Sequence, residues 1–433
     1  MIEIDMPKFF DEAFNNYIIR HFANCLTGTL KLGFDNGAWL ISFGNGTVKK
    51  VEKGPADAVT DLYIFATDDQ WLKMLEEYPK PFYNTFNMAA SYHGVKRSQN
   101  LLSQQYLPFL IEIMRELRAF YNGKPLIEAD PEPKKENVRF EEISGHYVYI
   151  TIDGIEYRVY YEEAGQGIPF LLQHTAGANS QEYRKLMNDP DFTRDFRFIA
   201  YDLPFHGKSL PPEEYPWWNH EYNLTLDFLL KFLDALISAL KLDRPAYLGC
   251  SMGGHLAADL AYYRPEKFRA AVGIGAGLTT AQEVVTEEAM SNTMAGVRYQ
   301  FNNPQVSNDA VGSTNDSVVA LHPYSTPNSQ REVWWDYANA GPGIFAGDIY
   351  YYSFDHNLVG KAKDIDTSKC MLYLLTGTYD PGTPPHTTKM LSDQVKGSKL
   401  TFMEGVGHYA MLEAYPTFKK YFAPFAEEIK TLK

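Results

Sequence analysis

Residues 249–253 read Gly249-Cys250-Ser251-Met252-Gly253, a G-x-S-x-G pattern. The short apolar run 246–248 precedes this pattern, and residues 254–261 continue it with helical spacing. The chain is therefore expected to turn sharply from a strand into a helix, and the two glycines leave room for so tight a turn. Such a turn places a serine hydroxyl at the end of a strand, beside helix N–H groups that can bind developing negative charge.

The composition is that of an ordinary globular protein. The chain has 433 residues, of which 45% are hydrophobic and 22% charged, enough for two or three domains with buried cores. Its net charge of −14 argues against non-specific binding to nucleic acid or to anionic membranes. We therefore expect a small molecule, and no nucleic acid, as the binding partner.

Cysteine usage and the lack of targeting patterns predict a cytoplasmic protein. Cys25, Cys250 and Cys370 lie far apart, without metal-ligand spacing, and are expected to be reduced thiols. Residues 1–5 do not resemble a signal peptide, and no run approaches the roughly 18 apolar residues of a membrane span. No loop has the P-loop or dinucleotide-binding pattern, so we expect neither a cofactor nor a metal.

One composition shift divides the chain. Residues 128–137 are charged, contain two prolines and have no apolar periodicity, which is typical of a linker. We therefore predict a first domain over residues 1–127 and a second over residues 138–433, both of ordinary size.

The second domain alternates strand-like and helical stretches. Runs such as 169–173, 246–248 and 371–376 are continuously apolar, as expected for parallel strands covered on both faces. Residues 224–242 carry leucines and phenylalanines at helical spacing. The pattern predicts an α/β fold with a mostly parallel, doubly wound sheet, in which chemistry takes place at the carboxyl ends of the strands.

Two further residues with catalytic potential follow predicted strands. Asp380 comes after the run 371–376, and His408 comes after the last strand, 400–403, within Gly405-Val406-Gly407-His408. A serine hydroxyl is a weak nucleophile at neutral pH and needs a base that is itself oriented by a carboxylate. Plainer roles also fit, because aspartate is favoured in turns and a histidine can cap or pack.

The pentapeptide, the strand-end acid, the Gly-x-Gly-His histidine and their order resemble the α/β-hydrolase superfamily over residues 138–433. The resemblance implies that Ser251 is the nucleophile, His408 the base and Asp380 the acid that orients it. It also implies an oxyanion hole formed by the N–H of Met252 and one N–H from the loop at residues 173–180. Alignment with the family favours Ala176 as that second donor, with Thr175 as the next choice. Both stay open because this chain reads His-Thr-Ala-Gly where many family members read His-Gly.

Residues 278–365 interrupt the predicted sheet between its sixth and seventh strands. In the superfamily this position usually carries a cap over the active site. The segment is rich in aromatic residues, which suit a pocket for an apolar or aromatic substrate but could equally form the cap's own core. Trp334 and Trp335, together with His174 of the 173–180 loop, are the substrate-contact candidates, although His174 also fits a loop-bracing role.

The first domain, residues 1–127, carries no recognisable catalytic group. Strand-like stretches meet at Asn36-Gly37 and Asn45-Gly46, which predicts hairpins, and a capped helix starts near Thr67. A long amphipathic helix is expected over residues 98–121. This smaller α+β unit resembles the sterol-carrier-protein-like fold, so it could bind a lipid-like ligand, form a homodimer or line the active site. We favour a structural or oligomerisation role.

These observations predict a serine hydrolase that cleaves a carboxylic ester of apolar or aromatic character through an acyl-enzyme. Two other reactions fit the same residues: hydrolysis of a carbon–carbon bond in a diketone-like substrate, and acyl transfer. A different class, a non-catalytic ligand-binding protein that works through its first domain, is the competing hypothesis. A serine at position 251 disfavours dehalogenases and epoxide hydrolases, which the superfamily builds on an aspartate.

Overall fold

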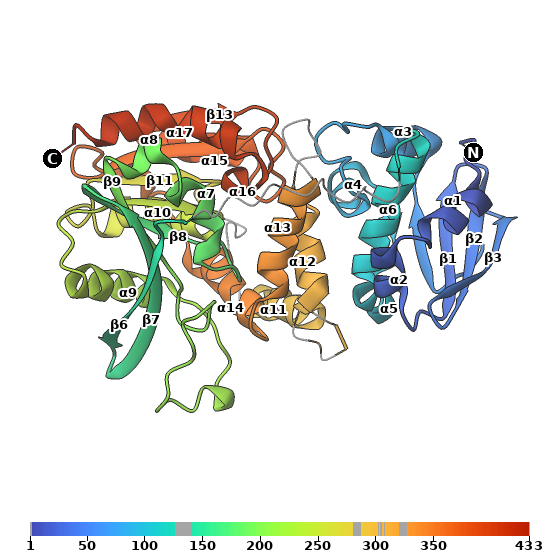
Figure 1. The fold of residues 1–433 in the computed structure, drawn as a ribbon, viewed down its shortest axis with the longest axis horizontal. Helices are drawn as coiled ribbons and strands as arrows, with labels where there is room; N and C mark the ends of the chain where they lie inside the picture. Colours follow the sequence, from blue (N-terminus) through green and yellow to red (C-terminus); the bar gives the residue numbers. More distant parts are fainter. Residues whose placement is uncertain are drawn as a thin grey trace. The chain divides into compact units, whose positions relative to one another are not determined.

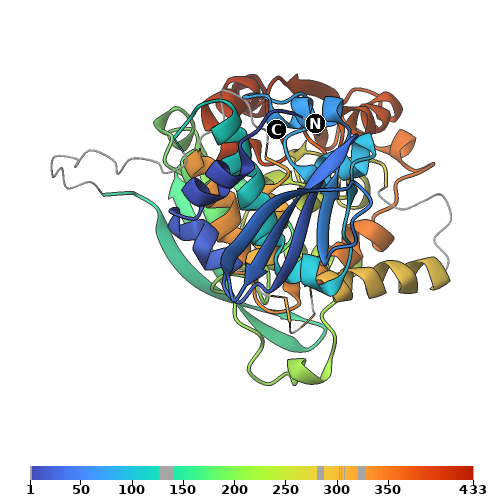
Figure 2. The same cartoon turned by 90° about the vertical axis from the view of Figure 1, so that its right-hand side faces the viewer.

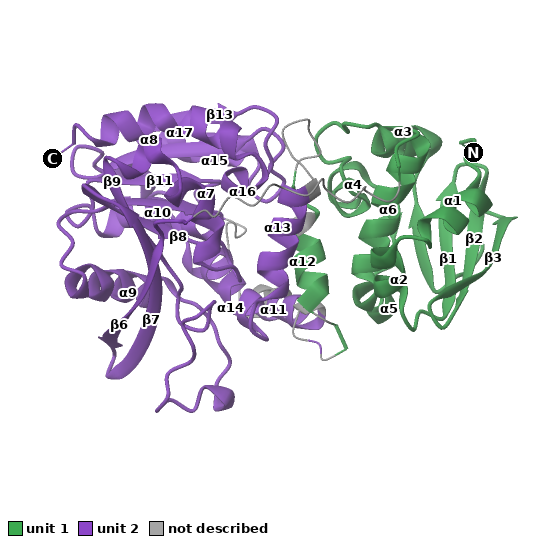
Figure 3. Cartoon of the chain, viewed as in Figure 1, with its two compact units in different colours: residues 1–138, 305–323 green, residues 139–304, 324–433 purple. Residues whose placement is uncertain are grey.

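The computed structural model describes residues 2–125, 140–279 and 287–432, apart from residues 302, 304, 307 and 320–326. The chain divides into two compact units (Figure 3). Unit 1 comprises residues 1–138 and 305–323, and unit 2 comprises residues 139–304 and 324–433. The predicted linker, 128–137, lies outside the described residues.

Unit 2 is built on an eight-stranded sheet in the order β13-β12-β11-β10-β8-β9-β7-β6 (Figure 1). All neighbours from β13 to β9 run parallel, and only the pairs of β7 with β9 and β6 are antiparallel. The predicted mostly parallel α/β sheet is thereby confirmed. Its strands are β6 (Ser144–Ile152), β7 (Ile155–Gly165), β8 (Ile168–Gln173), β9 (Phe196–Tyr201), β10 (Ala246–Cys250), β11 (Ala270–Ile274), β12 (Met371–Gly377) and β13 (Lys399–Met403).

Helices cover both faces of this sheet, because its central strands are apolar on both sides. On β10, Tyr247 packs with the helices of one face, whereas Ala246 and Leu248 pack with those of the other. The first face carries α9 (Leu226–Ala239), α10 (Met252–Tyr263) and α15 (Pro385–Gln394). The second carries α7 (Arg184–Met187), α8 (Pro190–Thr193), α16 (Ala410–Glu413) and α17 (Tyr415–Ile429).

The segment between β11 and β12 lies where the sequence predicted an insertion. Its helices in unit 2 are α11 (Glu287–Phe301), α13 (Pro327–Ala338) and α14 (Ile344–Tyr350), and α14 continues into a π-helical turn, Tyr351–Asp355. At the end of this turn, His356 donates through Nδ1 to Asp259 of α10, at 2.8 Å, and the Tyr351 hydroxyl donates to the same carboxylate at 2.6 Å. All three side chains are buried, so this cluster anchors the end of the insertion to the helix that follows Ser251.

Unit 1 has a five-stranded sheet in the order β3-β2-β1-β4-β5, which Figure 2 views face-on. The predicted Asn-Gly turns join β1 to β2 and β2 to β3 as antiparallel hairpins. The long predicted helix is divided at Tyr106 into two helices. The elements are β1 (Gly28–Phe34), β2 (Gly37–Gly44), β3 (Thr47–Gly54), β4 (Leu62–Phe65), β5 (Lys96–Arg97), α1 (Met6–Ala13), α2 (Tyr17–Ala23), α3 (Asp68–Leu75), α4 (Phe86–His93), α5 (Leu101–Gln105) and α6 (Leu107–Tyr121).

One helix of the insertion belongs to unit 1. Helix α12 (Asn308–Asp316) packs against α6 with Ala310 and Val311 buried. Just after this helix, the Asn84 amide donates to the carbonyl oxygens of Ser317 and Val319, at 2.9 Å each. The sequence predicted that the whole insertion would accompany the hydrolase-like domain, whereas these contacts place residues 305–323 with the first unit.

Among the helices that the structure describes, none is both long and apolar enough to cross a lipid bilayer.

Candidate active site

Ser251 sits at the turn between β10 and α10. Its backbone has φ 55° and ψ −114°, a strained conformation for a residue with a side chain. Both flanking glycines are required by space: a Cβ on Gly249 would lie 2.5 Å from the Gly253 carbonyl carbon, and one on Gly253 would lie 2.9 Å from the Gln173 side chain. Met252 is the first residue of α10, so its N–H has no acceptor within the helix.

Parallel pairing brings Asp380 and His408 to the same edge of the sheet as Ser251. Cys250, Ile274 and Leu375 are in register across β10, β11 and β12, and Gly377 pairs with Met403 of β13. The loops that follow these strands therefore share the carboxyl edge. The loop of His408 also contacts the serine turn, because the Cys250 thiol donates to the His408 carbonyl oxygen at 3.1 Å.

His408 and Asp380 are hydrogen-bonded. The Nδ1 of His408 lies 2.7 Å from Asp380 Oδ1, and both side chains are buried. The same Asp380 oxygen accepts the backbone N–H groups of Gly382, at 2.8 Å, and Thr383, at 2.9 Å. Three donors thus fix the orientation of the carboxylate, and the bond to Nδ1 leaves Nε2 as the ring nitrogen able to accept a proton.

The loop at residues 173–180 has its N–H groups largely engaged. The Thr175 N–H donates to Glu182 Oε2 at 2.8 Å, and the Gly177 N–H donates to Asp348 Oδ2 at 2.7 Å. The Ala178 N–H donates to the Thr175 carbonyl oxygen at 3.2 Å. Within the described residues, the Ala176 N–H has no acceptor, so it is available to bind a substrate oxygen.

Glu182 is buried behind the same loop. Its Oε1 accepts the Thr175 hydroxyl, which is also hydrogen-bonded to the Tyr337 hydroxyl from α13. Burial raises the pKa of Glu182 to about 8, against the opposing effect of the two hydrogen bonds from Thr175. Asp336, the neighbour of Tyr337, is likewise buried, and its pKa rises to about 7. The loop is thus held by a carboxyl group that is largely protonated at neutral pH.

The raised pKa of Glu182 predicts a pH-dependent contribution to stability. Between the ordinary value of 4.5 and about 8, the folded chain holds a proton that the unfolded chain has lost. The stabilisation from this group is therefore complete below the unfolded value and is lost as the pH rises through the folded value. Glu182→Gln mimics the protonated form, so we expect its melting temperature, relative to wild type, to increase from pH 5 to pH 8.

Thermal unfolding at the two pH values tests this expectation. Glu156→Gln is the matched control because Glu156 is exposed on β7. Its melting temperature relative to wild type should be the same at both pH values. If the difference in melting temperature between Glu182→Gln and wild type does not change with pH, Glu182 ionises in the folded chain as it does in the unfolded chain.

Asp348 and His206 form a second buried cluster at this loop. His206, in the loop after β9, places Nε2 at 2.8 Å from Asp348 Oδ2 and Nδ1 at 3.0 Å from the Pro204 carbonyl oxygen. Both ring nitrogens face oxygen atoms, and the doubly protonated, positively charged ring satisfies both contacts. Burial disfavours that charge, but the Asp348 carboxylate outweighs it, and the pKa of His206 is raised.

The candidate substrate-contact residues lie in different settings. His174 is fully buried, and its ring nitrogens pair with the Thr175 carbonyl oxygen at 2.8 Å and the Leu203 N–H at 3.1 Å. Both nitrogens are thus occupied by the backbone, the arrangement of a loop-bracing residue. On α13, Trp334 is half-buried, whereas Trp335 is 57% exposed.

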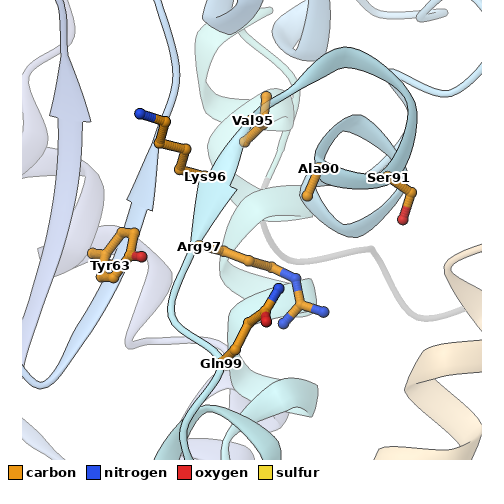
Figure 4. Close-up of a pocket in the computed structure, with 7 residues that line it drawn as sticks. All are labelled: Tyr63, Ala90, Ser91, Val95, Lys96, Arg97 and Gln99. Atoms are coloured by element: carbon orange, nitrogen blue, oxygen red, sulfur yellow. The ribbon is translucent and has the colours of Figure 1, made fainter. Parts of the chain in front are cut away.

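Unit 1 has a surface hollow of its own (Figure 4). Its volume is about 500 Å³, and its walls come from β4, α4, β5 and two residues that flank β5: Tyr63, Ala90, Ser91, Val95, Lys96, Arg97 and Gln99. The lining includes two cationic side chains and is mostly polar, unlike the apolar tunnel that a lipid-like ligand needs. In the part of the chain that is described, no group of three or more His, Cys, Asp or Glu side chains could hold a metal ion.

Three residues around the site were not singled out from the sequence. Glu182 lies in a polar stretch without any distinguishing pattern. His356 follows an aromatic block and lacks a motif. Asp348 did carry a signal, since it is a single acid flanked by the apolar and aromatic residues 344–346 and 349–352. A charge in such a setting is usually buried and paired, which could have marked it.

The chain belongs to the α/β hydrolase fold family, which matches residues 168–415. It is 24% identical over 278 residues to the 2-hydroxy-6-oxo-6-(2'-aminophenyl)hexa-2,4-dienoic acid hydrolase of Metapseudomonas resinovorans, covering 61% of this chain and 85% of that relative. The family and this relative make the protein an enzyme, a hydrolase.

Solved structures share the fold at low identity. A thermophilic esterase from Thermogutta terrifontis aligns with TM-score 0.56 and 16% identity, over 66% of this chain and 99% of that one. The enol-lactonase from Burkholderia xenovorans LB400 aligns with TM-score 0.51 and 17% identity, over 65% of this chain and 100% of that one. These likenesses describe the architecture of unit 2.

Proposed function

We propose that this hydrolase uses Ser251 as a nucleophile to cleave a carboxylic ester of apolar or aromatic character. The observation that carries the proposal is the pair formed by His408 and Asp380, with Nδ1 and Oδ1 2.7 Å apart, at the sheet edge where Ser251 occupies a strained turn. An oriented, buried imidazole at the same sheet edge as a serine held at a helix N-terminus is the arrangement expected to activate a hydroxyl for attack.

The reaction follows from these positions. As Ser251 Oγ attacks the ester carbonyl carbon, His408 Nε2 takes the hydroxyl proton, and the carbonyl oxygen becomes an oxyanion. His408 then passes the proton to the leaving alcohol, and the carbon–oxygen bond breaks to give an acyl-enzyme. Water attacks the acyl carbon, gives a proton to His408 and releases the carboxylic acid, and the proton returns to Ser251.

The N–H groups of Met252 and Ala176 would bind the oxyanion. Met252 opens α10, where an N–H has no helical acceptor and the helix dipole favours negative charge. Thr175, the other candidate from the sequence, already donates its N–H to Glu182, which supports Ala176 as the second donor.

A neutral substrate fits the described surroundings better than an anionic one. The buried polar side chains described in unit 2 are acids, histidines, amides and hydroxyls, without a lysine or arginine. A substrate carboxylate buried there would lack a free cationic partner, because the charged His206 ring is already paired with Asp348, and an unpaired buried charge is costly. This favours an ester over the dienoic acid for which the Metapseudomonas relative is named, although that relative keeps carbon–carbon bond hydrolysis as the second candidate.

Labelling with a fluorophosphonate tests the nucleophile without knowledge of the substrate. We expect wild type to form a covalent adduct at Ser251, located by peptide mass spectrometry, and Ser251→Ala to form none. Equal labelling of both would contradict the assignment. A panel of aryl esters, long-chain esters, lactones and diketones, each with and without an alcohol acceptor, then separates ester hydrolysis from carbon–carbon cleavage and acyl transfer.

For unit 1 we propose a structural or oligomerisation role, with a sterol-carrier-like architecture. Helix α6 packs against α12 of the insertion, and Val311 of α12 is buried. This packing supports a structural role for unit 1. Deletion of residues 1–127 should therefore alter oligomeric state or substrate range, as measured by light scattering and by the ester panel. A deletion variant with the oligomeric state and substrate range of wild type would contradict either role.

A further inference from the structure

We propose that Asp348 is a positioning residue for the oxyanion-binding turn, which it holds by the Gly177 N–H so that the Ala176 N–H stays free for the substrate oxygen. The proposal rests on the function proposed above, and it assigns a role in catalysis to a side chain of the insertion.

The carboxylate of Asp348 is fully buried and bonded on both oxygens. Oδ2 accepts the Gly177 N–H at 2.7 Å and His206 Nε2 at 2.8 Å, and Oδ1 accepts the Tyr222 hydroxyl at 2.9 Å. The Gly177 bond joins α14 of the insertion to the loop after β8, positions 171 residues apart in the chain. A single side chain therefore links the insertion to the turn that carries Ala176.

The positive charge of His206 stabilises the Asp348 carboxylate as the acceptor of the Gly177 N–H. His206 also donates through Nδ1 to the Pro204 carbonyl oxygen, so the ring is held as an imidazolium beside the Asp348 carboxylate. An ionised carboxylate only accepts hydrogen bonds and binds N–H groups more strongly than a neutral acceptor does. The pair thus presents a strong, fixed acceptor to Gly177 without leaving an unpaired buried charge.

Helix α14 also touches the turn through a second residue. Gly177 has φ 72°, and a Cβ there would lie 2.9 Å from the Phe345 ring. Phe345 precedes Asp348 by three positions, so both side chains leave the same face of the helix. With Glu182 holding the Thr175 N–H from the other side, both neighbours of Ala176 are fixed by buried carboxyl groups.

The oxyanion hole therefore depends on the position of helix α14. If α14 moved away, Gly177 would lose its hydrogen bond to Asp348 and its contact with Phe345, and the Ala176 N–H would no longer be fixed. Donors must be held to within a fraction of an ångström to stabilise an oxyanion. The effect should therefore appear in the chemical step and leave substrate binding largely unchanged.

The test compares full-length variants by their rates of fluorophosphonate labelling and by their kcat and KM for p-nitrophenyl butyrate. Asp348→Ala should lower the labelling rate and kcat by about 10- to 100-fold, less than the loss of an oxyanion donor itself, with KM within about threefold of wild type. Asp348→Asn keeps an oxygen for Gly177 and should recover most of the rate, although it loses the ion pair with His206 and some thermal stability.

Tyr222→Phe is the matched control, because it removes the bond to Oδ1 and leaves the Gly177 bond in place. It should label at the wild-type rate. Wild-type labelling by Asp348→Ala would overturn the proposal, and so would Asp348→Asn labelling as slowly as Asp348→Ala, since the rate would then follow the ion pair. If Asp348→Ala does not fold, Asp348→Ser, too short to reach Gly177, carries the same expectation. Failure of the proposed function looks different: wild type would not label at Ser251.

Discussion

Replacing His408 with alanine is expected to lower kcat on the order of 10⁴-fold, the usual cost of losing a member of a serine triad. Under the proposed mechanism, the variant keeps Ser251 in its strained turn and keeps the N–H groups of Met252 and Ala176, so a substrate should still bind and an oxyanion should still be held. What it lacks is a group to take the serine proton. KM should therefore change little, and the loss should appear in kcat and in the rate of fluorophosphonate labelling.

His386→Ala is the matched control for this variant. His386 is exposed on α15, and in the described residues no hydrogen bond joins it to Ser251, Asp380 or His408. Its turnover should equal that of wild type. Added imidazole should partly restore turnover to His408→Ala, because the vacated space lies beside Asp380, but not to Ser251→Ala. A His408→Ala enzyme with near-normal turnover would remove this residue from the mechanism.

The two sheets could be predicted from the sequence because strands and tight turns leave local patterns of apolar residues and of Asn-Gly pairs. Continuous apolar runs such as 246–248 and 371–376 can only be covered on both faces, and Asn-Gly at residues 36–37 and 45–46 can only be a tight turn. Gly249 and Gly253 were predicted to leave room for a tight turn, and in the structure a Cβ at either position would lie within 3.0 Å of a neighbouring atom. The strand ends that carry Ser251, Asp380 and His408 could be recognised for the same reason, since each follows an apolar strand.

The groups that hold the loop at residues 173–180 could not be found in this way. Glu182 lies seven positions from Thr175, but Asp348 lies 171 positions from Gly177, and their contacts exist only after the chain has folded. A single acid near an aromatic block does not reveal which N–H it will bind. The place of α12 in unit 1 was hidden for the same reason, because its partner α6 precedes the linker and lies nearly 200 residues away.

Asp380→Asn should be less damaging than Asp380→Ala, because the backbone fixes the orientation of the side chain. Asp380 Oδ1 accepts His408 Nδ1 and the N–H groups of Gly382 and Thr383, whereas the structure gives Oδ2 no partner. An asparagine amide will place its oxygen, not its nitrogen, where three donors converge. His408 therefore keeps its orientation and its proton on Nδ1, and the variant loses only the negative charge.

The size of the loss then measures that charge. At an effective dielectric constant of about 20, a pair of unit charges about 4 Å apart interacts by roughly 4 kcal/mol, or about 10³-fold in rate. We expect Asp380→Asn to lower kcat by about this factor and Asp380→Ala, which also frees the ring, by about 10⁴-fold. Steady-state kinetics of both variants decide the matter. If asparagine costs as much as alanine, the amide has turned its nitrogen toward His408 in spite of the two backbone donors, and orientation rather than charge dominates the contribution of Asp380.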